Sequence, residues 1–316
     1  MINYKVCLTT KVKASAGTGA GSGILVIEPE DYTQAEISAL KKAGYKVLGY
    51  LSIGSVSDER SYYKDLKPYR LSRLEDWEHE WYIDLRRSAV RTWAVMRARE
   101  IKALGCDGWW IDNLDVCEYH RHRTMIAGIT MTLRNIKALG GYVMVNGGIT
   151  YLTDMMIPYK VQIGAYSHKD NADRMLKSIK SKGFSPVIVE MDGLFKVQCG
   201  AFSSMDNAAK RAEDLHAAGF DTAIVRMSDC AVSSIIDGVT QEEVFSVIKD
   251  YDHNVFGTQD KDESERYQQH LIRLRKHGVQ TFLLEYTTSN ILKLMIKAFC
   301  TEKDMNGYYV SDDKDL

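Results

Sequence analysis

Carboxylates gather around one short apolar run in this chain of 316 residues. The run Trp109-Trp110-Ile111 is followed at once by Asp112, and Asp107 and Asp115 flank it. Two carboxyl groups held together, one ionised and one protonated, can act as base and acid in one reaction. Carboxylates at the C-terminal end of a buried strand are also how α/β barrels present catalytic groups. We therefore interpret residues 105–115 as one half of a candidate acid–base site.

A strand-end aspartate can also be structural, because it can cap a helix or form an ion pair. Asp107 precedes the apolar run, which favours a structural role, whereas Asp112 ends it, which favours a chemical one. The carboxylates available for the other half of the site are Asp115, Glu285 and one of Glu242 and Glu243. Adjacent residues on a strand point to opposite faces, so only one of these two can enter the mouth of a barrel.

The elements that would position these carboxylates follow a strand–helix repeat. Residues 89–104 have the apolar spacing of a helix and stop at Gly105, as a helix C-terminus should. Short apolar stretches with polar C-terminal ends recur, and eight are predicted to be strands, near residues 4, 24, 46, 108, 142, 236, 279 and 308. Eight strands separated by helices predict the α/β class and a (β/α)8 TIM barrel.

An internal duplication interrupts the repeat between the fifth and sixth predicted strands. Residues 159–189 and 195–225 align at a constant offset of 36, and each half reads strand, helix, strand. Such a duplication marks a separate folding unit. We expect barrel segments at residues 1–157 and 228–316, interrupted by an inserted α+β (βαβ-βαβ) domain at residues 158–227.

Two motifs resemble glycoside hydrolase family 114, the endo-α-1,4-polygalactosaminidase-like barrels. They are Y-L-S-I-G at residues 50–54 and G-C-D-G-W-W-I-D-N-L-D at residues 105–115. The resemblance implies an endo-acting glycoside hydrolase that cleaves an amino-sugar polysaccharide with two carboxyl groups and neither metal nor organic cofactor. It makes Asp112 the nucleophile or base and Glu242 the acid, with the sugar positioned by Tyr50, Asp115, Asn146, Glu285 and Tyr286.

The duplicated segment has its own signature, V-Q-x-G-A-[FY], at residues 161–166 and 197–202. It resembles the SPOR domain, which binds peptidoglycan glycan strands stripped of their stem peptides. We expect Gln162 and Gln198 on an open polar face of its sheet, with Lys160 and Lys196 alongside, where they would bind glycan. The same face would otherwise dock on the barrel as a lid.

A long polar connection at residues 55–81 is rich in aromatic side chains: Tyr62, Tyr63, Tyr69, Trp77 and Trp81. Long loops on a barrel are often functional, and exposed aromatic rings suit the apolar faces of sugars. Any one of these rings is equally expected to pack beneath the loop.

Composition excludes several classes of function. A net charge of −1 and a pI near 6.7 give no field for a polyanion, so nucleic acid is not an expected partner. The six cysteines, without a CxxC pair, are expected to be free and mostly buried. No apolar run has transmembrane length, and the first residues lack the apolar core of a signal peptide. With a wall-directed module, these features predict a monomer made in the cytoplasm that meets the cell wall on release, as a phage or prophage lysis enzyme does.

Two other functions stay open at this point. One is a catalytically inactive cell-wall or glycan-binding protein on a barrel scaffold. The other is an aldolase-like barrel, which the absence of a lysine at the predicted strand ends disfavours.

Overall fold

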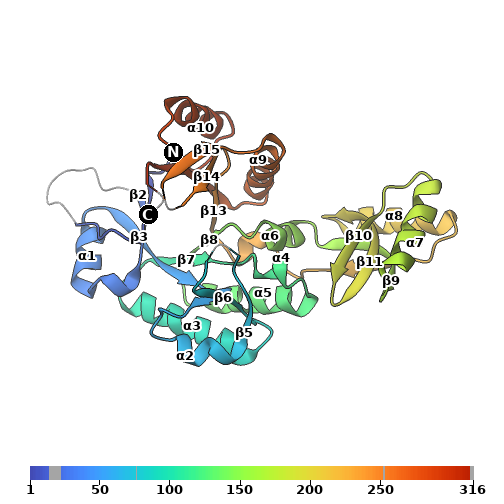
Figure 1. Cartoon of the computed structure of the whole chain (residues 1–316), viewed down its shortest axis with the longest axis horizontal. Coiled ribbons are helices and arrows are strands. Elements are labelled where there is room, and N and C mark those ends of the chain that lie inside the picture. The colour runs from blue at the N-terminus through green and yellow to red at the C-terminus, as the bar shows by residue number, and fades with distance from the viewer. Residues whose placement is uncertain (14–22, 76, 252, 314–316) are drawn as a thin grey trace. The chain divides into compact units, whose positions relative to one another are not determined.

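The computed structural model describes residues 1–13, 23–75, 77–251 and 253–313. The chain divides into two compact units (Figure 1). The first unit holds Met1–Leu114, Thr130–Gly148 and Ser233–Leu316, and the second holds Asp115–Ile129 and Ile149–Val232. Within the described ranges, no helix is both long and apolar enough to cross a membrane.

A sheet of eight parallel strands forms the centre of the first unit. In spatial order the strands are β1 (Tyr4–Cys7), β2 (Gly23–Ile27), β3 (Tyr45–Ser52), β7 (Gly108–Asp112), β8 (Tyr142–Asn146), β13 (Gly238–Glu242), β16 (Gln280–Tyr286) and β17 (Gly307–Ser311). The N–H of Ile2 donates to the carbonyl of Asn306 at 2.6 Å, which brings β1 to β17 and nearly closes the sheet. The predicted (β/α)8 architecture is confirmed.

The two-residue period of a strand decides which side chains fill this barrel. Even-numbered residues form one interior cluster, namely Tyr4, Val6, Ile24, Val26, Leu48, Trp110, Met144, Phe282, Leu284 and Tyr286. Inside it the hydroxyls of Tyr4 and Thr240 lie 2.7 Å apart, and Trp110 Nε1 donates to them at 3.0 and 3.2 Å. These buried polar atoms therefore satisfy one another.

Several helices of the first unit begin at residues that cap their first turn. Thr33 and Glu36 form a capping box at α1 (Gln34–Lys42), and Asp260 and Ser289 cap α9 (Lys261–Lys276) and α10 (Asn290–Glu302). The other helices and helical turns along the barrel segments are η1 (Pro29–Asp31), α2 (Tyr63–Leu66), η2 (Lys67–Tyr69), α3 (Ser88–Ala103), α4 (Val116–Tyr119), α5 (Arg123–Lys137), α6 (Ile149–Met156) and η3 (Val232–Ser234).

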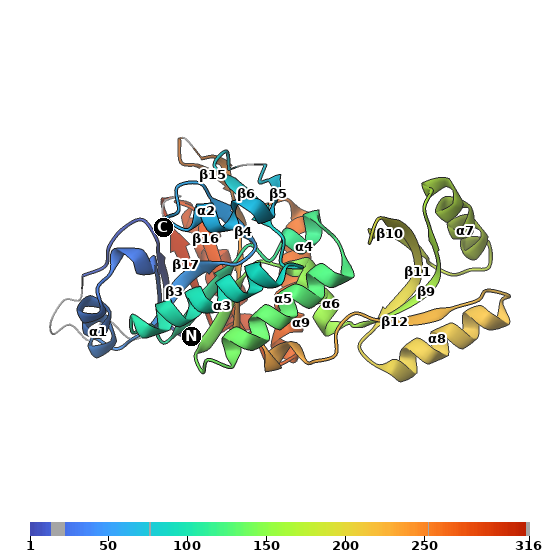
Figure 2. The same cartoon turned by 90° about the horizontal axis from the view of Figure 1, so that it is seen from below.

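Two small antiparallel sheets follow the C-terminal ends of barrel strands. After β3 come β4 (Ser55–Ser57), β5 (Arg70–Arg73) and β6 (Glu80–Ile83), paired in the order β4-β6-β5. After β13 comes the hairpin β14 (Ser246–Asp250) and β15 (Val255–Thr258). In Figure 2 the labels of β4, β5, β6 and β15 lie together at the top of the first unit.

The second unit contains a four-stranded antiparallel sheet in the order β10-β11-β9-β12. Its strands are β9 (Tyr159–Tyr166), β10 (Val187–Met191), β11 (Leu194–Phe202) and β12 (Ala223–Arg226), and its helices are α7 (Lys169–Ser181) and α8 (Met205–Ala217). Both helices share one core with the strands, formed by Val161, Ala172, Ile179, Val197, Cys199, Ala208 and Leu215. Both therefore cover the same face of the sheet, as the duplication predicts.

The opposite face is not as open as the sequence led us to expect. Lys160, Lys196 and Gln198 are each only 7% exposed, and Gln162 is half-buried. Lys160 Nζ lies 3.2 Å from Asp154 on α6, and Lys196 pairs with Asp192 in the β10–β11 turn. The expectation that these three side chains stand on an open face is therefore wrong, because acidic partners draw the lysines into buried ion pairs.

Candidate active site

Five strands of the barrel each contribute one polar side chain to its C-terminal edge. The residues are Tyr50 on β3, Asp112 on β7, Asn146 on β8, Glu242 on β13 and Tyr286 on β16. Each stands two positions after an interior residue of the same strand, respectively Leu48, Trp110, Met144, Thr240 and Leu284. Because strands alternate faces, the register that buries the core also directs these groups into the mouth.

Asp112 accepts hydrogen bonds on both carboxyl oxygens. Its Oδ2 accepts from the Tyr50 hydroxyl at 3.1 Å, and its Oδ1 accepts from Asn146 Nδ2 at 3.1 Å and from the Asn113 N–H at 2.9 Å. Donors directed at a carboxylate stabilise its negative charge. Asp112 is thus arranged as a base or nucleophile.

Glu242 accepts from two side chains on neighbouring strands. Asn146 Nδ2 donates to its Oε1 at 2.5 Å, and the Tyr286 hydroxyl donates to its Oε2 at 2.7 Å. Burial raises the pKa of Glu242 above its usual value, although both hydrogen bonds act in the opposite direction. A carboxyl group with a raised pKa keeps its proton closer to neutral pH, as a general acid must.

The two carboxyl groups face each other across a single amide. Asn146 Nδ2 contacts Asp112 Oδ1 and Glu242 Oε1, and the sum of the two distances limits how far apart those oxygens can be. That limit is below about 6.5 Å, the smallest separation usual for inverting glycosidases. The two carboxyl groups are therefore close enough to act on one glycosidic bond.

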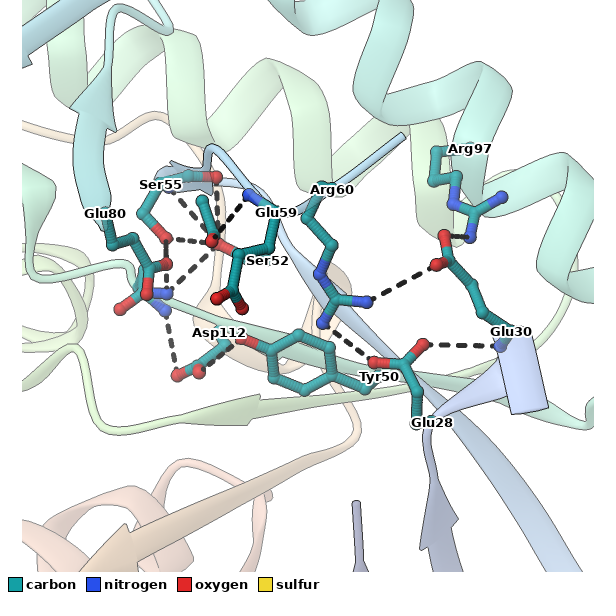
Figure 3. Close-up of polar contacts among 12 residues, drawn as sticks. Glu28, Glu30, Tyr50, Ser52, Ser55, Glu59, Arg60, Glu80, Arg97 and Asp112 are labelled. Atoms are coloured by element: carbon teal, nitrogen blue, oxygen red, sulfur yellow. Dashed lines mark hydrogen bonds and ion pairs between the residues drawn. The ribbon is translucent and has the colours of Figure 1, made fainter. Parts of the chain in front are cut away.

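A turn after β7 holds Asp112 in place. Asn113 has a φ of 64°, and its side-chain amide donates to Ser52 Oγ at 3.0 Å and Ser55 Oγ at 2.7 Å. Ser55 in turn donates to Glu80 on β6 (Figure 3). A left-handed backbone at a residue other than glycine is strained, and this network retains it beside the reacting carboxylate.

Sequence reasoning missed a group of charged side chains beside Tyr50. Arg60 Nη2 lies 2.8 Å from Glu28 Oε2, and its guanidinium stands 5.7 Å from the centre of the Tyr50 ring. Figure 3 shows Arg60 between Glu28 and Glu30, and the Tyr50 hydroxyl directed at Asp112. Glu28 follows β2 as Asp112 ends β7, so the acidic strand end was a signal for it; nothing in the sequence singled out Arg60.

Glu285 does not reach the mouth, which corrects the expectation that it binds sugar. It is fully buried and accepts from the N–H groups of Phe245 and Ser246 at 2.9 to 3.2 Å and from the Ser246 hydroxyl at 2.5 Å. Its neighbour Tyr286 faces Glu242, so strand alternation turns Glu285 outward. Glu243 likewise points away, accepting from the Ile248 N–H at 2.7 Å.

The other aspartates of residues 105–115 have separate places. Asp107 accepts from the Val47 N–H at 2.9 Å and pairs with Lys41 at 2.7 Å, which is the structural role expected for it. Asp115 is the N-cap residue of α4 and belongs to the second unit, so its contact with sugar stays a prediction. Across the described ranges, no group of three His, Cys, Asp or Glu side chains is placed to hold a metal ion.

Comparisons with known proteins agree with this fold. Among solved structures, the glycoside hydrolase domain of PelA from Pseudomonas aeruginosa gives a TM-score of 0.63 at 13% identity, covering 99% of this chain and 96% of that chain. Ega3 of Aspergillus fumigatus, in complex with galactosamine, gives 0.54 at 13% identity, covering 100% and 92%. Likenesses at such low identity show the fold alone.

One further solved structure matches a short part of the chain, and two family models match it as well. The peptidoglycan binding domain of the B. subtilis cell wall lytic enzyme CwlC is 49% identical over 21% of this chain and 85% of that chain, with a TM-score of 0.20. No curated protein matches. The SPOR domain model matches residues 156–226, and the model of glycoside-hydrolase family GH114 matches residues 3–160, half of the chain. This chain therefore belongs to glycoside-hydrolase family GH114, and it carries a SPOR domain.

Proposed function

We propose that this glycoside hydrolase is an endo-acting enzyme that cleaves an amino-sugar polysaccharide with Asp112 and Glu242. The observation that carries the proposal is the Asn146 amide, which contacts both carboxyl groups at the C-terminal edge of the barrel. One of the two is surrounded by donors and suits the ionised form, and the other is buried with a raised pKa. That division is what glycoside cleavage requires.

In the proposed reaction, the proton of Glu242 passes to the glycosidic oxygen while an Asp112 oxygen bonds to the anomeric carbon. The bond between that carbon and the glycosidic oxygen breaks, and the shortened chain leaves. Water then attacks the anomeric carbon, gives its proton to Glu242 and releases Asp112 as a carboxylate. The short separation of the carboxyl groups supports this double displacement, which retains the anomeric configuration.

Four neighbours support these roles. Tyr50 and Asn113 donate to Asp112 and would keep its charge in place before reaction. Tyr286 orients Glu242 from the opposite side of the mouth. Asn146 would move its hydrogen bonds between the two groups as charge shifts from one to the other, which is a form of electrostatic stabilisation.

The substrate class rests on likeness and composition. The GH114 match and the galactosamine bound to Ega3 support a polymer of galactosamine or its N-acetylated form. The near-neutral net charge supports a glycan partner over a nucleic acid. We also propose that the SPOR domain binds peptidoglycan glycan strands, so that the enzyme works as a monomer at the cell wall.

Digestion of defined polymers tests the proposal. The protein would be incubated with α-1,4-linked galactosamine polymer, with its N-acetylated form and with purified peptidoglycan, and the fragments identified by mass spectrometry. We expect internal cleavage of an amino-sugar polymer by the wild type and none by Asp112→Asn. Equal release of fragments by both proteins would contradict the assignment. Proton NMR of the first products would report retention or inversion.

A further inference from the structure

An aromatic pair at the barrel mouth is unusually exposed. Of the rings at residues 55–81, Tyr62 packs on Trp93 with centroids 5.0 Å apart, and Tyr63 packs on Trp81 at 5.8 Å. Trp77 does not share this packing and is 54% exposed. Its contact is with Tyr251, which is itself 45% exposed. Exposed apolar groups that touch one another are characteristic of binding sites.

Trp77 and Tyr251 come from two separate loops. Trp77 lies between β5 and β6, and Tyr251 lies between β14 and β15. Their ring centroids are 5.9 Å apart, with an angle of 70° between the planes. In this edge-to-face contact a ring edge covers at most one ring face, so both residues keep a face open.

Both loops are anchored to the barrel beneath this pair. Ile248 and Phe256 of the hairpin pack against the interior cluster of the barrel. On the other side Leu74 is buried, and its N–H donates to the carbonyl of Glu80 at 3.0 Å.

The two loops that carry the pair follow strands whose ends hold groups of the candidate site. One loop follows β3, which carries Tyr50, and the other follows β13, which carries Glu242. Between β3 and β13 in the sheet are β7 and β8, with Asp112 and Asn146. Tyr251 is also close enough to Tyr286 to contribute to its raised pKa.

We propose that Trp77 and Tyr251 form a binding platform for a pyranose ring of the amino-sugar chain, next to the ring whose bond is cleaved. A galacto-configured ring carries three C–H groups on one face, and that face stacks on aromatic rings. The ammonium group of a deacetylated residue gains further from the electron-rich ring faces. This inference rests on the proposed function, because it assigns a subsite to the same mouth.

Kinetics on long and short substrates test the platform. In Trp77→Ala and Tyr251→Ala we expect KM for an α-1,4-linked galactosamine polymer to rise about five- to tenfold, with kcat changed less than about twofold. KM for an aryl galactosaminide, which has one sugar ring and therefore no neighbouring ring to place on the platform, should change little. Trp77→Phe and Tyr251→Phe should recover most of the affinity. Met96→Ala on α3 is the control, since Met96 is 55% exposed and lies on an outer helix.

Direct binding separates failure of the platform from failure of the proposed function. In a Glu242→Gln background, calorimetry would compare a galactosamine octamer with and without Trp77→Ala. Unchanged affinity and KM in the alanine variants would overturn the platform while cleavage by the wild type stands. Weaker octamer binding in a protein whose wild type cleaves no polymer would support the platform and overturn the hydrolase proposal. Loss of binding in Met96→Ala as well would overturn the platform, because it would show a general effect on the fold.

Discussion

Four carboxylates at one edge of the barrel sheet divide into two regions. Asp112 and Glu242 form the mouth region, where side chains of neighbouring strands donate to them. Glu243 and Glu285 form the wall region, where the donors come from the chain that leads into the β14–β15 hairpin. The residue types and the sheet edge are the same in both regions. Glu285 differs from Asp112 and Glu242 in the parity of its position along its strand. Glu243 follows the end of β13 and has a φ of 57°, so a change of backbone direction turns it away from the mouth.

The mouth and wall regions should therefore respond differently to mutation, one in turnover and the other in stability. A change in the mouth region should lower turnover and leave stability nearly unchanged, because most donors to Asp112 and Glu242 are side chains, which can turn toward other partners. A change in the wall region should lower stability first, because buried N–H donors would lose their acceptor. The four predictions that follow run from the largest expected effect on turnover to the smallest.

Asp112→Asn should have the largest effect. The amide cannot carry the negative charge that attacks or stabilises the anomeric carbon, so we expect kcat to fall by about 10⁴-fold. The thermal unfolding midpoint should stay within about 2 °C of the wild type. Kinetics on amino-sugar polymer with parallel calorimetry would measure both. A large loss of stability would show that Asp112 supports the fold as Glu243 and Glu285 do, which would contradict the division into two regions.

Glu242→Gln should lower kcat by about 10²- to 10⁴-fold, since the amide has no proton to transfer. The wild-type rate should also fall on the alkaline side as Glu242 loses its proton, and burial moves that decline above the usual pKa of a glutamate. A pH–rate profile of the residual activity in Glu242→Gln should lack this alkaline limb. A limb at the same pH in both proteins would assign the acid to another group.

Glu285→Gln should act mainly on stability. Burial raises the pKa of Glu285 from 4.5 to about 7, so the folded protein holds this proton more tightly than the unfolded chain. The stability that this bound proton contributes is fully present below about pH 4.5 and is lost as pH rises through about 7. We expect wild-type unfolding free energy to fall by a few kcal/mol between pH 5 and 8 and the variant to lose less.

Denaturant unfolding of both proteins at the two pH values would measure this difference. Turnover of Glu285→Gln should remain within about tenfold, because its side chain never enters the mouth. The same pH slope in both proteins would show that Glu285 does not titrate in this range. Glu243 offers a second group for the same pH measurement, because burial also raises its pKa to about 7.

Replacement of residues 158–226 by a short Gly/Ser linker should affect turnover least. Asp154 would lose Lys160 but keep Arg121 at 3.0 Å, while residues 121–123 would lose their contacts with Asp192 and Arg226. We expect a folded barrel with kcat on soluble polymer within about twofold of the wild type and no sedimentation with peptidoglycan. An unfolded product would show that the segment is integral to the barrel, and undiminished sedimentation would show that wall binding lies elsewhere.

The strands were predictable because each element carries its own local signal. β7 and β13 each begin at a glycine that follows an aspartate, Asp107-Gly108 and Asp237-Gly238. Each aspartate accepts from a backbone N–H of the neighbouring strand, that of Val47 at 2.9 Å and that of Val143 at 2.8 Å. The same local pattern located Asp112 and showed that only one of Glu242 and Glu243 could enter the mouth, and the family resemblance chose Glu242.

What could not be predicted depends on contacts between distant segments. Arg60 meets Glu28 across 32 residues, and Trp77 meets Tyr251 across two loops whose paths no local pattern sets. The lysines of the duplicated segment were misjudged because their acidic partners, Asp154 and Asp192, are found only in three dimensions. Glu285 is a different case: it adjoins Tyr286, and alternation alone admits only one of the two to the mouth.

The buried contact between Tyr4 and Thr240 bears on when the enzyme becomes active during its synthesis. These two hydroxyls are separated by 236 positions in the chain, and Trp110 joins them from a third strand. Contacts of such long range form late, because the entropy of closing a large loop must be lost before the contact can stabilise the fold. On the ribosome, Asp112 would emerge long before the strand that supplies Glu242. The nascent chain therefore has no complete pair of carboxyl groups, and hydrolytic activity begins only after most of the polypeptide has been synthesised and the barrel has closed.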